Sequence, residues 1–302
     1  MKSGVRMTFT EFIKANLKSF NAHLLRHIKN KSGTSLEDAM NYSLDANGKR
    51  LRPLLLLAVL ESFQVSVEKG YPAASALEMI HTYSLIHDDL PAMDNDDFRR
   101  GKPTNHIQFN EATAILAGDA LLTLAFEVIT KSDLSHNVQI ELIKKLAQTS
   151  GYEGMVGGQQ ADIDGEGSDL SLEEIEHIHL RKTGALIEMA TVGAGLIAEK
   201  PQEILECLSE LAKEIGIAYQ VRDDILDVVG TKEDLGKEVA TDAALGKSTY
   251  PSLLGLEGSF SALNEHLNAA EEILLNIQEL DNDFQKDLLI SFVRQLSLEE
   301  YR

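Results

Sequence analysis

Cysteine, tryptophan and proline are scarce in this sequence: among 302 residues there are one cysteine, six prolines and no tryptophan. The single cysteine, Cys207, excludes an internal disulfide and suits a reducing compartment, and we interpret it as a small buried apolar side chain. Few prolines leave long stretches free to form helices, which the abundant leucine, alanine and glutamate favour. Alternating apolar and polar residues, the pattern of a half-buried strand, are nearly absent. The composition therefore predicts an all-α protein.

Positive charge is also in short supply. With 28 Lys and Arg against 48 Asp and Glu, the formal net charge is -20, and no basic stripe is left to neutralise a nucleic-acid backbone. The longest aliphatic run, Leu54 to Leu60, is far shorter than the ~20 residues that span a bilayer, and the first residues contain no apolar signal core. We therefore expect a cytoplasmic protein that binds no nucleic acid and has no stable membrane anchor.

Apolar residues recur at helical spacing along nearly the whole chain, as at Phe9 and Phe12. Helix starts are expected at Ser35 and Ser171, because each hydroxyl can accept a hydrogen bond from an exposed amide of a first turn. No change of composition marks a linker, so residues 1–302 are expected to form a single all-α domain of about ten or more helices around a central cavity. Glycine or proline interrupts the helical pattern at residues 151–158, 165–167 and 200–201.

Aspartates are crowded into two short motifs far apart in the sequence. The first motif contains Asp88, Asp89 and Asp94, and the second contains Asp223, Asp224 and Asp227. Crowded carboxylates raise each other's pKa unless a cation neutralises them. Ligand sets made only of oxygen favour magnesium or calcium, and magnesium is usually shared with substrate phosphates. The two motifs together predict a metal-assisted diphosphate site, although either motif alone is also typical of a solvated acidic helix face.

A polyanionic substrate requires positive charge that this acidic chain supplies at few places. A basic cluster follows the first motif directly, at Arg99, Arg100 and Lys102. Guanidinium groups match phosphate oxygens in a two-pronged geometry, so a metal and arginines together can hold a diphosphate. The candidate phosphate-binding cations are Lys49, Arg50, Arg52, Arg99, Arg100, Lys182, Lys237 and Lys247.

Six blocks of the sequence resemble one known family in order and spacing. The blocks are residues 48–53, 81–94, 99–101, 157–159, 182–184 and 220–227, the last continuing to 236–237. The chain is similar to the short-chain trans-prenyl diphosphate synthases, and most of all to those of the bacterial farnesyl type, over most of its length. This resemblance implies an all-α isoprenoid-synthase bundle, isoprenoid diphosphates as substrates, and a homodimer.

The resemblance also implies an ionisation, condensation and elimination reaction. About three magnesium ions, or manganese in their place, would bridge the allylic diphosphate to Asp88, Asp94 and Asp223. The secondary metal ligands would be Asp89, Asp224 and Asp227. The catalytic set implied is Arg99, Lys182, Thr183 and Gln220. Lys237 and Lys247 would join Arg99 and Lys182 on the allylic diphosphate.

The second substrate, isopentenyl diphosphate, would bind without metal. The resemblance implies that Lys49, Arg52, His81 and Arg100 hold its phosphates. The released pyrophosphate would then remove the proton that completes the reaction.

Product length is expected to depend on the residues before the first aspartate motif. Tyr83 lies five residues and Ser84 four residues before Asp88, so one of them projects toward the growing tail. A tyrosine ring there would act as a floor, which favours a fifteen-carbon farnesyl product. The wording of residues 94–106 also resembles geranylgeranyl synthases, so a geranylgeranyl diphosphate synthase of the same family is the alternative.

Three rival interpretations come from other classes. A di-iron bundle is suggested by the Glu-x-x-His spacing of Glu78 and His81, and of Glu174 and His177. A non-catalytic regulatory subunit of the same family is the second rival, but the complete aspartate motifs argue against it. A terpene cyclase is the third, and it normally carries a different second metal motif.

Overall fold

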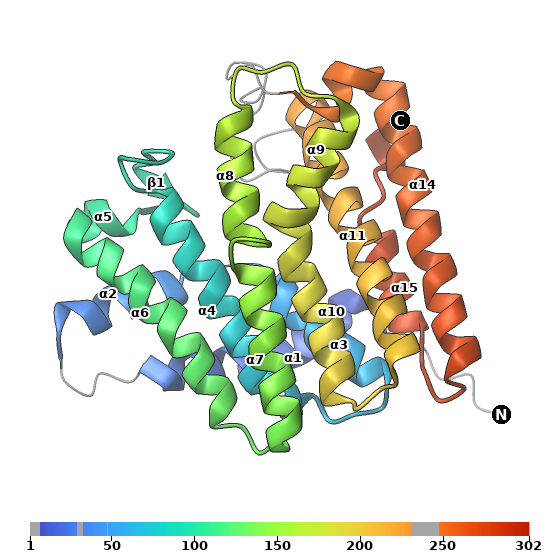
Figure 1. Cartoon of the computed structure of the whole chain (residues 1–302), viewed down its shortest axis with the longest axis horizontal. Helices are drawn as coiled ribbons and strands as arrows, with labels where there is room; N and C mark the ends of the chain where they lie inside the picture. The colour runs from blue at the N-terminus through green and yellow to red at the C-terminus, as the bar shows by residue number, and fades with distance from the viewer. Residues whose placement is uncertain (1–6, 29–32, 47, 231–247, 302) are drawn as a thin grey trace.

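The computed structural model describes residues 7–28, 33–46, 48–230 and 248–301. Within these residues the chain is an assembly of helices, most of which run along one common direction (Figure 1). The predicted all-α class is confirmed there, with a single two-stranded hairpin, β1 (Phe98–Arg99) and β2 (Lys102–Pro103), as the exception. The helices are α1 (Phe9–Leu25), α2 (Ser35–Leu44), α3 (Leu51–Ser62), α4 (Tyr71–Asp88), α5 (Asn105–Gln108), α6 (Glu111–Thr130), α7 (His136–Ser150), α8 (Met155–Gly165), α9 (Leu172–His179), α10 (Ala185–Ile197), α11 (Gln202–Val229), α14 (Tyr250–Leu280) and α15 (Asp287–Arg294).

Side-chain caps fix several helix starts. Ser171 caps α9 and Glu174 bonds back to it, which confirms the start predicted there. The start predicted at Ser35 is displaced by one residue, because Thr34 is the cap and accepts from the amide of Glu37. Thr8 and Glu11 form a further reciprocal box at the start of α1.

The core forms around α3 and α10. The aliphatic run from Leu54 to Leu60 in α3 is wholly buried, so its seven apolar positions serve packing. α10 packs against α3, α7 and α11, and it lies among these helices in Figure 1. One continuous cluster of buried apolar side chains extends from Phe9 to Leu298. Burial of this size is the main driving force that holds the helices together.

α6 has the length and apolar composition of a membrane span, alone among the described helices. This apolar character is not visible as an uninterrupted aliphatic run in the sequence, because Asp119 and Thr123 divide the apolar residues of α6. One face of α6 packs along α4 and α2, while Leu116, on its other face, is 56% exposed. Core helices of globular proteins pass the same test of length and composition, so this property alone assigns no membrane.

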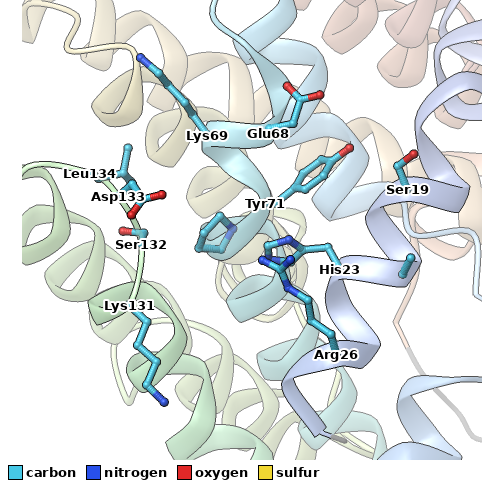
Figure 2. A pocket seen from close by; sticks show the side chains of 12 residues that line it. Ser19, His23, Arg26, Glu68, Lys69, Tyr71, Lys131, Ser132, Asp133 and Leu134 are labelled. Atoms are coloured by element: carbon cyan, nitrogen blue, oxygen red, sulfur yellow. The ribbon is translucent and has the colours of Figure 1, made fainter.

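A cavity of about 690 Å³ lies at the N-terminal end of α4, away from the aspartates at its other end. α1, the start of α4 and the connection from α6 to α7 line it, and His23 projects into it beside Tyr71 (Figure 2). The rings of His23 and His27 meet edge to face with centroids 4.9 Å apart. The buried Nε2 atoms of both histidines lack a hydrogen-bond partner. Burial lowers the pKa of each to about 4, helped by the charge of Arg26.

We expect this histidine pair to make folding stability depend on pH. Both imidazoles are neutral in the folded protein and regain a pKa near 6.5 on unfolding, so the unfolded state binds more protons below that pH. The contribution of each histidine is fully present above pH ~6.5 and falls toward pH ~4, by roughly 1 kcal/mol at pH 5 after allowance for partial exposure. Urea unfolding at pH 7 and pH 5 measures the loss, which a His23→Gln/His27→Gln variant should reduce. Equal losses in variant and parent would refute the assignment.

Candidate active site

The first aspartate motif is the end of α4 and the turn that follows it. Asp88 is the last residue of α4 and Asp89 is its C-cap. The chain then doubles back, because the amide of Asp94 donates to the carbonyl of Asp88 at 2.8 Å. Asp89 is buried, Asp88 is half-buried and Asp94 is exposed. Three carboxylates predicted to act together therefore do lie on one turn.

Burial and mutual repulsion set the electrostatics of this turn. Burial, together with repulsion from Asp94 and Asp89, raises the pKa of Asp88 to about 6, although Lys182 and Arg99 act in the opposite direction. Burial also raises the pKa of Asp89, although Arg99 donates to its carboxylate at 2.6 Å. The turn thus carries more negative charge than its neighbouring cations neutralise, which is the condition that favours a bound metal.

The β1–β2 hairpin, which follows the first aspartate motif, contains Arg99 and Arg100. Arg100 and Gly101 form its turn, both with positive φ (53° and 77°). This geometry sends Arg99 back to Asp89, while the Arg100 guanidinium packs on Gly48, where an added Cβ would lie 2.4 Å from Nη1. Of the basic cluster predicted after the aspartates, Arg99 therefore faces them, Arg100 reaches the residue before Lys49, and Lys102 lies over the ring of Tyr42 instead.

A π-helical turn, η3 (Leu180–Gly184), carries Lys182 and Thr183. Lys182 Nζ lies 2.6 Å from Asp162 Oδ2, and the Thr183 hydroxyl donates to Gln220 Oε1 at 2.8 Å. Neither the π turn nor a role for Asp162 was predicted from the sequence. The available signal for Asp162 was its position four residues after Gly158, which places both residues on the same face of α8. Such turns are frequent at functional sites. The predicted residues Lys182, Thr183 and Gln220 are thus brought together, with Lys182 acting on Asp88 across the site.

Gly158 sets how closely α8 approaches this turn. A Cβ at position 158 would lie 2.2 Å from the backbone nitrogen of Lys182 and 2.7 Å from the carbonyl carbon of Arg181. Backbone cannot yield as a flexible side chain can. Gly158 is therefore a requirement of the site as well as of the packing.

The second aspartate motif lies near the end of α11. Asp224 and Asp227 are buried, and Asp223 is half-buried. The predicted helical spacing is confirmed, since all three lie within α11. Asp224 has an additional structural role, because its Oδ2 accepts from the amide of Tyr250 at 3.0 Å and so fixes the first turn of α14.

Arg52 of α3 and Arg100 of the hairpin lie close to His81 of α4. Arg52 Nη1 and His81 Nε2 are 3.4 Å apart, and burial lowers the pKa of Arg52 while Tyr219, Glu78 and Asp223 act in the opposite direction. Burial, together with Arg52 and Arg100, lowers the pKa of His81 well below its usual value. Arg52, His81 and Arg100 therefore form one group beside the second motif.

Three further cations were predicted to bind phosphate, and the structure describes one of them. Lys49 is exposed just before the N-terminus of α3, three residues before Arg52 in the sequence. Lys237 and Lys247 fall in residues 231–247, outside the described part of the chain.

The side chains that could coordinate a metal do not form a complete metal site by themselves in the described part of the chain. Within the described ranges, no three His, Cys, Asp or Glu side chains gather closely enough to hold an ion. This argues against the di-iron interpretation, because Glu78 is instead bonded to Arg50 and Glu174 caps its own helix. Carboxylate oxygens on two separate helix ends fit magnesium that a substrate diphosphate completes.

An all-α bundle that presents two aspartate motifs together with arginines, a lysine and a neutral histidine has the architecture of the prenyl diphosphate synthases. The family model "Polyprenyl synthetase" matches residues 34–284. The chain belongs to the polyprenyl synthetase family.

Sequence and structure comparisons agree with this assignment. The chain is 51% identical to the farnesyl diphosphate synthase of Micrococcus luteus over 86% of this chain and 89% of that protein. It is 49% identical to that of Bacillus subtilis (strain 168) over 84% and 86%. The structure of a geranyltransferase from Helicobacter pylori, complexed with magnesium and isoprenyl diphosphate, matches with a TM-score of 0.84 and 32% identity over 97% and 99% of the two chains. A geranylgeranyl diphosphate synthase from Cyanophora paradoxa is less similar, at 45% identity.

Gly158→Ala should reduce activity more than it reduces stability. Relief of the backbone clash must displace η3, and a displacement near 1 Å at a catalytic group costs on the order of 100-fold in rate. We expect kcat to fall at least about tenfold while the protein stays folded. The matched control is Gly193→Ala in α10, where the nearest atoms to the new Cβ belong to side chains, Met189 at 3.2 Å and Leu142 at 3.6 Å, and not to backbone. Equal kcat values in the two variants would contradict the role given to Gly158.

Proposed function

We propose that this protein is a farnesyl diphosphate synthase, a prenyltransferase that condenses isopentenyl diphosphate with dimethylallyl or geranyl diphosphate. The observation that carries the proposal is that the first aspartate motif lies with Arg99 and Lys182, while Arg52, His81 and Arg100 form a separate group beside the second motif. Two kinds of diphosphate site follow: one where carboxylates need a metal, and one made of cations alone. The high identity to bacterial farnesyl diphosphate synthases supports the same reaction.

The allylic diphosphate site is assigned to the two aspartate motifs. Asp88, Asp94 and Asp223 would hold magnesium shared with the diphosphate. Bound magnesium supplies Lewis-acid withdrawal of charge from the departing group. About three ions are proposed, and manganese is an alternative. Asp89, Asp224 and Asp227 support the ligands, since all three are buried beside them.

The protein's own residues orient this substrate and stabilise its ionisation. Arg99 and Lys182 bind the diphosphate oxygens as negative charge grows on them. Lys237 and Lys247 are assigned the same role from the resemblance. Thr183 and Gln220, joined by their 2.8 Å hydrogen bond, hold oxygen atoms toward the allylic carbon and so stabilise the cation.

The isopentenyl diphosphate site is assigned to Lys49, Arg52, His81 and Arg100. The lowered pKa of His81 keeps its imidazole neutral, so it can bind a phosphate as a hydrogen-bond donor without adding charge beside the arginines. The double bond attacks the allylic cation, and the released pyrophosphate accepts the proton.

Tyr83 is proposed as the floor that stops growth at fifteen carbons. Its side chain is buried on α4, and its ring contacts that of His87 with centroids 5.7 Å apart. His87 in turn lies 3.0 Å from the carbonyl oxygen of Ile115 on α6, so the floor is braced against a second helix. Ser84 faces its own helix instead, because its hydroxyl donates to the carbonyl of His81.

The chain is proposed to act as one catalytic domain and as a homodimer. The continuous core from Phe9 to Leu298 supports a single domain. The exposed apolar face of α6, with Ile115 and Leu116, is a surface that a second copy would cover. A cytoplasmic location is consistent with one buried, unpaired cysteine.

The proposal is tested by incubating purified protein with labelled isopentenyl diphosphate, geranyl diphosphate and magnesium, and sizing the dephosphorylated alcohols. We expect a fifteen-carbon product that EDTA abolishes, because the carboxylates cannot hold the diphosphate without a cation. A twenty-carbon product would identify a geranylgeranyl diphosphate synthase. Absence of any product would favour the regulatory-subunit alternative.

Tyr83→Ala should lengthen the product. Removal of the ring opens space below the fifteen-carbon tail, so we expect a twenty-carbon alcohol to become a main product, with kcat within about tenfold of the parent. Tyr152→Ala is the matched control, because the Tyr152 side chain is exposed and lies on the connection before α8. An unchanged product from Tyr83→Ala would show that another side chain limits the tail.

A further inference from the structure

We propose that Glu78 is a positioning residue for the isopentenyl diphosphate site: through a buried ion pair with Arg50 it fixes the turn that presents Lys49 and Arg52. The inference rests on the proposed function, since it deepens the assignment of that site. Glu78 itself does not touch substrate, because it is only 2% exposed and would repel a diphosphate.

Arg50 is a buried cation whose side chain points into the protein. It is 5% exposed, and its Nη1 lies 2.5 Å from Glu78 Oε1. Its Nε donates to Asn21 Oδ1 at 3.2 Å, and Nη2 donates to the carbonyls of Leu44 and Ala46. Although Arg50 stands in sequence between two cations assigned to phosphate, its own charge is committed to these partners. It is therefore an anchor for the turn.

The backbone at Arg50 needs such an anchor. Its φ of 48° and ψ of 35° are left-handed, and no side-chain hydrogen bond caps α3 at this residue. A bulky non-glycine residue holds that conformation only where its surroundings impose it. Lys49 precedes this turn and Arg52 lies in the first turn of α3, so the conformation of Arg50 decides where both cations point. Glu78 is the partner of opposite charge among the contacts that the structure describes for Arg50, and loss of one partner of a buried ion pair is strongly destabilising.

Glu78 also balances the other cations of the group. Four guanidiniums, of Arg50, Arg52, Arg99 and Arg100, act on His81 through their charge, and Glu78 acts favourably on both Arg52 and Arg100. Without its carboxylate these charges would repel one another in the unliganded site and spread apart. Glu78 thus keeps the cations assembled before the diphosphate arrives, which is preorganisation of a binding site.

Glu78 and His81 have the Glu-x-x-His spacing that is typical of a metal-ligand pair. The structure gives the two residues separate roles on α4: Glu78 faces Arg50, and His81 faces Arg52. The three-residue spacing places both side chains on the face of α4 that contacts the start of α3. The motif is thereby accounted for without a metal.

The test is steady-state kinetics of Glu78→Gln with each substrate varied in turn. We expect KM for isopentenyl diphosphate to rise about tenfold and KM for geranyl diphosphate to stay within about twofold of the parent. Asp281→Asn is the matched control, because it removes a different ion pair, to Lys200 at 2.6 Å, at the C-terminal end of α14. Both KM values should be unchanged in that control.

A second variant separates positioning from support of the fold. Loss of Glu78 alone leaves a buried unpaired charge on Arg50, so Glu78→Gln should also lower the unfolding midpoint. Arg50→Met/Glu78→Gln removes the stranded charge and should recover the midpoint while KM for isopentenyl diphosphate stays raised. Asn21→Ala, which removes only one hydrogen bond to Arg50, should raise the same KM by about twofold to threefold and fold normally.

The outcomes distinguish this inference from the proposed function. A folded Glu78→Gln protein with unchanged KM for isopentenyl diphosphate, or a double variant that recovers that KM together with its stability, would overturn the inference alone. Equal rises in both KM values would overturn it too, since they indicate general loosening. A parent protein that forms no condensation product would overturn the proposed function, and the inference with it.

Discussion

Crowding of carboxylates at two helix C-termini is the constraint on which the rest of this structure depends. Asp88 ends α4, and Asp227 lies in the last turn of α11, so both motifs stand at the negative ends of helix dipoles. Burial adds to the repulsion, as the raised pKa of Asp88 shows. Protein cations reduce this cost without removing it, because Arg99 bonds Asp89 and Lys182 is shared with Asp162. An external cation with a diphosphate supplies the missing charge.

Close packing of helices fixes the position of η3, whose Lys182 and Thr183 are proposed to act on that diphosphate substrate. Gly158 brings α8 onto η3, and a Cβ at Gly216 of α11 would lie 2.9 Å from the Cα of Gly184 in the same turn. η3 is therefore held between two helices at near-backbone contact. Thr183 and Gln220 meet as a result, and Lys182 reaches the first aspartate motif. A site assembled on rigid elements in this way needs little reorganisation when charge develops.

The sequence predicted features that depend on neighbouring residues, but it did not predict features that depend on tertiary packing. Helical periodicity and the spacing of Asp223 and Asp227 predicted the helices and the face that carries the second motif, because these are short-range properties. The π turn at η3 was not predictable, since its residues have ordinary helical propensity and its geometry comes from packing. The pair formed by Arg50 and Glu78 joins residues that only the tertiary fold brings together. The overall apolar character of α6 was not apparent from uninterrupted aliphatic runs, because Asp119 and Thr123 divide its apolar residues.

The measurement that tests the central claim most directly is calorimetric titration of magnesium into the protein with and without inorganic pyrophosphate. If the carboxylates form two incomplete half-sites, magnesium should bind weakly alone and at least about 100-fold more tightly with pyrophosphate present. Asp88→Asn should abolish most of that difference. Equally tight binding of magnesium without pyrophosphate would show that the protein alone completes a metal site, and would contradict the account.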